Sequence, residues 1–206
     1  MDWFAQRSPD FFSITDQPRL YLQRRSPPDL NETTMDRLFL DYSTARLGEF
    51  RKRIDACLER LTDEQVWARG HANENAIANL ILHLNGNVRQ WILSGLGGQP
   101  DQRNRDAEFS SDEGPSKAEL LKRLGSTVEE AIEVIRKVPA PMLTERRSIQ
   151  GYEITVLEAI YQVVQHFSGH TAQIIFATKM LTGADLGFYR ELKGSGMNPS
   201  AAAPAP

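Results

Sequence analysis

The sequence is nearly free of cysteine. Its 206 residues include a single one, Cys57, so the chain cannot form an intramolecular disulfide, and its composition fits a reducing compartment. Cys57 falls among apolar residues spaced three and four apart, which predicts a small buried side chain on a helix rather than a nucleophile. The presence of a single cysteine excludes the class of small secreted domains that are held together by internal disulfides.

The sequence also lacks an excess of one charge and a long apolar run. It has 24 Lys and Arg against 27 Asp and Glu, so it shows no basic footprint typical of nucleic-acid binding. No segment approaches the ~18 uninterrupted apolar residues of a transmembrane helix. The N-terminus has no basic start followed by an apolar run and does not resemble a secretory signal. We therefore expect a cytoplasmic protein that binds neither nucleic acid nor membrane.

The two ends of the chain differ from its centre. Residues 1–34 mix prolines with scattered charges and keep no helical or alternating pattern, which predicts an N-terminal extension, flexible or loosely docked. Met35 stands where the first regular helix begins and is an alternative start codon to Met1. Residues 191–206 are dominated by Gly, Ser, Ala and Pro, which predicts a disordered tail. The folded domain is expected over residues 35–190.

The central region has four long segments with apolar residues at helical spacing. They predict helices over Met35–Leu61, Ala76–Ser94, Ser116–Val138 and Thr155–Leu181. Asn75 is the expected N-cap of the second helix, and capping-box patterns begin at Thr62, Ser116 and Thr155. Each helix has one apolar stripe to bury, so the predicted fold is all-α, a four-helix bundle.

Two connections interrupt this pattern. Residues 95–115 are long and polar, and such a link can cross from one end of a bundle to the other. They include Arg103, Arg105 and Glu108, and the link is predicted to be a solvated crossover. Residues 147–154 alternate weakly around Gln150 and Gly151, which indicates a small hairpin or an irregular turn.

Histidines provide the main chemical signal. His166 and His170 are four residues apart in the last predicted helix, so they lie on one face, where two imidazoles can hold one metal ion. His83, beside the apolar stripe of the second helix, is the preferred third ligand, and His71, in a loop, is the substitute. The alternative is that these histidines are ordinary polar residues of helices and bind no metal.

Small and polar residues flank the histidines. Asn87 lies near His83, and Gln162 and Gln173 lie beside the pair on the last helix. Such side chains leave room for a cleft, whereas tight core packing would favour larger apolar groups. Asn87, Gln162 and Gln173 are therefore candidates to orient the imidazoles or to contact a substrate, although each fits equally well as a polar residue at a helix boundary.

Three neutral imidazoles would leave at least one coordination position open for water or a substrate atom. No Asp or Glu flanks the pair on its own helix face, which counts against a carboxylate-bridged centre with two metal ions. A metal ion held by histidines lowers the pKa of bound water to about 7 and deprotonates a bound thiol. Imidazole ligation suits zinc, nickel, iron and copper. We expect a divalent ion, with zinc or nickel first and iron or manganese next.

Two segments that contain these histidines are similar to a known family. They are Ile77–Ile92, and Thr155–Ile160 followed by His166–Ile175. They resemble the second and fourth helices of the DinB superfamily of metal-binding bundles, which includes YfiT-like proteins. Residues 106–109 and 185–189 resemble one bacterial branch of that superfamily, whose function is uncharacterised. The resemblance covers residues 35–189 and leaves out the N-terminal extension and the tail.

The resemblance implies a four-helix bundle with a long crossover between the second and third helices. It implies a divalent metal ion on His83, His166 and His170, and it implies a homodimer, as in many relatives. Some relatives are transferases or isomerases that use small thiols such as bacillithiol or mycothiol.

The first functional hypothesis is therefore a metal-dependent transferase or hydrolase that activates a low-molecular-weight thiol, or water, for attack on a small electrophile. The alternative is a non-catalytic metal-binding protein of a stress response that acts through dimerisation or a partner. No catalytic acid or base can be named from the sequence.

Overall fold

The computed structural model describes residues 34–71 and 73–189, and this part of the chain is mainly helical. Its long helices are α2 (Met35–Leu58), α4 (Ile77–Val88), α6 (Lys117–Arg136) and α7 (Val156–Thr182), and the π-helix η2 (Arg89–Ser94) continues α4. Three short helices lie in the connections: α3 (Asp63–Trp67), α5 (Arg105–Ser110) and the 3₁₀-helix η3 (Ala140–Thr144). The all-α prediction is confirmed.

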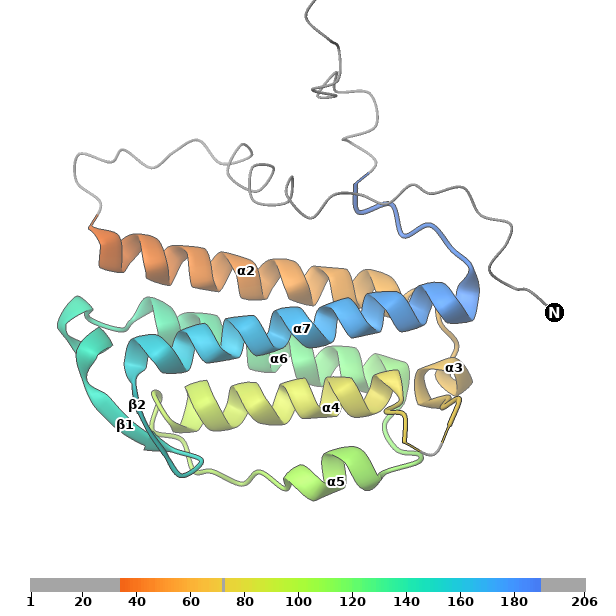
Figure 1. Cartoon of the computed structure of the whole chain (residues 1–206), viewed down its shortest axis with the longest axis horizontal. Helices are drawn as coiled ribbons and strands as arrows, with labels where there is room; N and C mark the ends of the chain where they lie inside the picture. The colour runs from red at the N-terminus through yellow and green to blue at the C-terminus, as the bar shows by residue number, and fades with distance from the viewer. Residues whose placement is uncertain (1–33, 72, 190–206) are drawn as a thin grey trace, which may run out of the picture.

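The four long helices pack side by side (Figure 1). Both α2 and α4 contact α6 and α7, so the latter two helices lie between them. The apolar stripes meet in one core, where Phe50 of α2 stacks on Phe167 of α7 with ring centroids 6.3 Å apart. Burying each large apolar side chain contributes about 1.5–3 kcal/mol. No helix in the described part of the chain is long and apolar enough to cross a bilayer.

Local signals start and stop the helices much as the sequence predicts. Capping boxes form at Thr62, Ser116 and Thr155, where each hydroxyl accepts from a backbone N–H three residues later. Gly183, with φ of 64°, ends α7, in a left-handed conformation that glycine adopts without strain. The predicted hairpin is confirmed as strands β1 (Arg146–Ile149) and β2 (Tyr152–Thr155), paired antiparallel.

Some predicted helix ends are wrong. The first helix ends at Leu58, before the predicted Leu61, because the N–H of Arg60 turns back to the carbonyl of Cys57 in a tighter bond. Asn75 is not the N-cap of α4. The N-cap is Ala76, whose backbone N–H donates to the side-chain oxygen of Asn79 one turn later. The second helical segment ends at Ser94 as predicted, but its hydrogen bonding changes after Val88 to the wider π-helix η2.

The predicted solvated crossover is also wrong in part. Residues 105–110 form helix α5, which packs on α4 (Figure 1). Glu108 is buried with 7% exposure, and the side chain of Arg103 is only 4% exposed. The predicted N-terminal extension and C-terminal tail lie outside the described residues, except for Thr34, whose side chain caps α2.

Candidate metal centre

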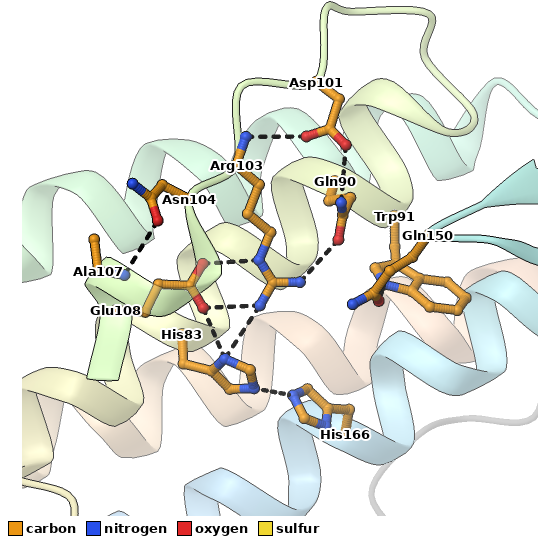
Figure 2. A network of polar contacts seen from close by, with 10 residues as sticks. All are labelled: His83, Gln90, Trp91, Asp101, Arg103, Asn104, Ala107, Glu108, Gln150 and His166. Carbon is orange, nitrogen blue, oxygen red and sulfur yellow. Dashed lines mark hydrogen bonds and ion pairs between the residues drawn. The ribbon is translucent and has the colours of Figure 1, made fainter. Parts of the chain in front are cut away.

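The three preferred histidines meet in space. His83 lies on α4, and His166 and His170 lie one turn apart on α7. Each offers a ring nitrogen, and these nitrogens all lie within 4.8 Å of one another. The Nε2 atoms of His83 and His166 are 2.9 Å apart (Figure 2). The substitute ligand, His71, is exposed and is not part of this cluster.

Neighbouring oxygen atoms orient two of the three imidazoles. The Nδ1 atom of His83 is 2.8 Å from Oε2 of Glu108, and the Nδ1 atom of His170 is 2.7 Å from Oε1 of Gln173. A carboxylate and an amide oxygen only accept hydrogen bonds, so in both rings Nδ1 carries the proton and donates. The lone pair of each ring is then on Nε2, which is the atom left to bind a metal ion.

Glu108 is held as an anion by Arg103. The guanidinium donates from Nε to Oε1 and from Nη2 to Oε2, both at 2.8 Å (Figure 2). Nη2 also lies 3.1 Å from Nδ1 of His83, but both atoms are donors here, so the shorter contact of His83 with Glu108 is the hydrogen bond. Burial alone would raise the pKa of Glu108, yet the hydrogen bonds from Arg103 and His83 outweigh it and lower that pKa.

The arginine is itself anchored. Its Nη1 donates to Oε1 of Gln90, 2.9 Å away, and its backbone N–H donates to Asp101, whose carboxylate also accepts from Gln90 (Figure 2). The chain of contacts therefore runs from Asp101 through Arg103 and Glu108 to His83. Because each member is held by the next, the position of the His83 ring depends on the crossover as well as on α4.

Two residues of α4 allow α5 to come close. The Nδ2 atom of Asn79 donates to the backbone carbonyls of Glu108 and Ser111, at 3.0 and 2.9 Å. At Gly86 there is no side chain, and a Cβ there would lie 1.9 Å from Oε1 of Glu108. Glycine at position 86 thus leaves the space that the carboxylate fills. Phe109 completes the contact, with its ring centroid 4.6 Å from that of His83.

The comparison with protein families gives a match over most of the chain. The family described as "Protein of unknown function (DUF1572)" matches residues 34–190. The chain belongs to the DUF1572 family. The matched residues include the three clustered histidines and the crossover that holds Glu108.

A solved structure is similar to this DUF1572 chain. It is described as the "Crystal structure of the conserved protein of locus from Enterococcus faecalis", with a TM-score of 0.58 and 12% sequence identity. The similarity covers 70% of this chain and 97% of that one. At such low identity the similarity shows a shared fold alone. A search of curated proteins gave no match.

In this DUF1572 protein the pKa values of two of the clustered imidazoles, His166 and His170, are lowered. Burial lowers the pKa of His166 to about 4, and the positive charge of His170, His83 and Arg103 acts in the same direction. Burial also lowers the pKa of His170, and the hydrogen bond to Gln173 opposes this only in part. Neutral imidazole is the form that binds a metal ion. The lowered pKa values of His166 and His170 therefore favour the form of these two rings that can bind a metal ion.

A pocket of about 400 Å³ adjoins the cluster, and His83 and His166 form part of its wall. Asn87 and Gln162, two of the predicted flanking residues, line this pocket, whereas the third, Gln173, bonds directly to His170. Asn87 and Gln162 thus lie beside the pocket and Gln173 lies against an imidazole; a role for them in binding a ligand stays a prediction. A pocket of this size suits a small molecule.

The sequence does not predict the contacts of Glu108 and Arg103 with His83. It predicts a solvated link for both residues, whereas their side chains are buried beside His83. One available signal was Asn104, whose side chain caps α5 by accepting from the N–H of Ala107, as an asparagine before a short helix often does. That pattern predicts a helix, but it does not say which side chain points toward His83.

Proposed function

We propose that His83, His166 and His170 bind one divalent metal ion, with zinc or nickel as the first candidates. The observation that carries this proposal is the orientation of the rings: Glu108 and Gln173 accept from the Nδ1 atoms of two histidines, which leaves their Nε2 atoms as ligands. A carboxylate behind a metal-binding histidine is a common arrangement. Three imidazole nitrogens fit a divalent transition metal and leave a coordination position open.

We further propose that the domain is a DinB-type four-helix bundle. Support comes from the order of the ligands, with one histidine on the second long helix and two, four residues apart, on the fourth. The connection from α4 and η2 to α6 is long, as in that superfamily, and it contributes α5. A DUF1572 family without a described activity agrees with the uncharacterised branch that the sequence resembles.

The proposed reaction is the transfer of a low-molecular-weight thiol, or of water, to a small electrophile. A divalent ion at this site would supply Lewis-acid activation of the thiol or water. Glu108 keeps the His83 ring in place, and Arg103 keeps Glu108 ionised. Asn87 and Gln162 line the adjoining pocket, where they can orient the two reactants. The nucleophile forms a bond to an electrophilic carbon and releases its proton, while a leaving group departs or the electrophile takes up a proton.

The metal site is tested by elemental analysis of protein purified without a histidine tag. We expect about one ion per chain in the wild type and in His71→Ala, since His71 is exposed and outside the cluster. His166→Ala should lose the metal ion while keeping its helical circular-dichroism spectrum. A metal-free wild type together with a normally folded His166→Ala variant would contradict the proposal.

The reaction is tested by a conjugation screen of small thiols against reactive electrophiles, with and without added metal. Metal-dependent product should form with the wild type and be lost in His170→Ala. If no thiol gives such turnover although the metal ion binds, the second function is favoured: a non-catalytic metal-binding protein of a stress response that acts through dimerisation or a partner. The hydrogen-bonded cluster of His83, His166 and His170 supports metal binding under either of these two functions.

A further inference from the structure

The pocket beside the histidine cluster is positively charged. It extends from His83 and His166 to Trp91 and to Tyr152 of the hairpin, and two arginines, Arg103 and Arg105, line it. None of the described residues that line this pocket is Asp or Glu. A pocket lined by one sign of charge attracts small molecules of the opposite sign.

The two arginines differ in how much of their charge is balanced. Arg103 gives two hydrogen bonds to Glu108 and one to Gln90. Arg105 forms no ion pair with any carboxylate in the part of the chain that the structure describes. Its guanidinium lies over the ring of Phe109, 5.1 Å from the centroid, and Phe109 itself packs on His83. Arg105 is exposed to solvent and lies next to the cluster, and no carboxylate among the described residues pairs with its charge.

A buried acceptor in the same wall also lacks a partner. Asn87, one turn after His83 on α4, is 6% exposed, and its Oδ1 atom has no hydrogen-bond partner among the described residues. Buried polar atoms without a partner are rare and costly. Turning the Asn87 amide toward the pocket would bring this acceptor to a ligand that carries an N–H or O–H group.

The end of the pocket away from the histidines is aromatic, and a hydrogen bond fixes its tryptophan. The indole N–H of Trp91 donates to Oε1 of Gln150 at 3.1 Å (Figure 2). The Trp91 and Tyr152 ring centroids are 6.3 Å apart. His83, Asn87 and Trp91 follow at spacings of four, so they lie in a row. A ligand that lies along this row would contact the histidines at one end, Asn87 in the middle and the rings of Trp91 and Tyr152 at the other end.

We propose that this pocket binds a small organic acid, with its carboxylate paired to Arg105, a hydrogen-bond donor directed at Asn87 and its carbon body against Trp91 and Tyr152. One unpaired arginine suits one carboxylate, which it can bind through two hydrogen bonds. The inference rests on the proposed function in one respect. If the proposed reaction occurs at this site, its substrates are thiols that carry a carboxylate.

The test compares thiols that differ only in the carboxylate. Isothermal titration of the metal-loaded protein would use 3-mercaptopropionate and N-acetylcysteine, each paired with its neutral amide. We expect each acid to bind at least ~10-fold more tightly than its amide, since charge-assisted hydrogen bonds are the stronger ones. Arg105→Gln should remove this preference. Arg60→Gln, a change of an exposed arginine outside the pocket, should keep it.

Three results would overturn the inference: equal binding of acid and amide to the wild type, an acid preference that survives in Arg105→Gln, or no binding of any acid. The conjugation screen distinguishes this failure from failure of the proposed reaction. Arg105-dependent acid binding without any conjugation would keep the inference and refute the reaction. Metal-dependent conjugation of neutral and acidic thiols at equal rates, without an acid preference in binding, would keep the reaction and refute the inference.

Discussion

Replacing Gly86 by alanine gives the sharpest test of the contact between α4 and α5. The added Cβ would lie 1.9 Å from Oε1 and 2.9 Å from Cδ of Glu108, and 3.1 Å from Nε of Arg103. A flexible glutamate could normally move aside. Here Arg103 holds both carboxylate oxygens and His83 contacts one of them, so Glu108 cannot move without breaking these bonds.

The expected cost follows from those bonds. A hydrogen bond to a charged group contributes about 1.5–3 kcal/mol, and the displacement of Oε1 breaks at least one of them. Alanine in a helix is favoured over glycine by ~1 kcal/mol, which offsets part of the loss. We expect Gly86→Ala to lower the free energy of unfolding by about 0.5–2 kcal/mol for each such bond that breaks, which corresponds to a Tm lower by roughly 1–8 °C for a domain of this size.

The measurement is thermal and urea unfolding of metal-free protein, followed by circular dichroism, so that metal binding does not contribute. The matched control is Gly169→Ala in α7, where a Cβ would meet no atom within 4 Å. That variant should be more stable than the wild type by about 0.4–1 kcal/mol. A Gly86→Ala protein as stable as the wild type would refute the account of Glu108 as a rigidly held group.

The remaining predictions concern the charge and burial of single groups. Glu108→Gln should weaken metal binding about 10- to 100-fold in competition with a chelator, because the carboxylate that orients His83 is lost; unchanged affinity would rule out that role. In metal-free protein, acidification from about pH 6.5 toward pH 4 should lower the free energy of unfolding, because unfolded His166 takes up a proton near its ordinary pKa of 6.5 and folded His166 only near 4. Urea unfolding at several pH values across this range should show that the free energy of unfolding changes less with pH in His166→Gln than in the wild type. Burial raises the pKa of the Cys57 thiol, so Cys57 should react with a thiol reagent only after unfolding; rapid labelling of the native protein would contradict its burial.

Much of the helical architecture could be predicted from local patterns. The capping boxes at Ser116 and Thr155 determine where two helices begin, and each depends only on residues three apart. Local patterns are insufficient where one side chain contacts two elements. Asn79 accepts from the N–H of Ala76 and donates to the carbonyl of Glu108 in α5, so Asn75 is not the cap, although its place before the apolar stripe predicts that it is.

The same holds for the candidate metal site, of which one part could be predicted from the sequence and another could not. The spacing of His166 and His170 places both on one face of any helix, so the sequence by itself determined that pair. His83 could be chosen over His71 because it lies in a regular helix, and the structure places it in the cluster. The orientation of the His83 ring could not be predicted, because the carboxylate that it contacts belongs to the crossover, in a segment with no strong pattern.

The sequence alone therefore determined the helices, their apolar faces and the residue types able to bind a metal ion, since these depend on helical periodicity over a few residues. Tertiary structure decided which groups surround them. Glu108 reaches His83 because Gly86 leaves space and Arg103 balances the buried charge. Arg105 of α5 has no carboxylate partner among the residues that the structure describes. Such contacts join residues distant in sequence, and the path of the chain brings them together.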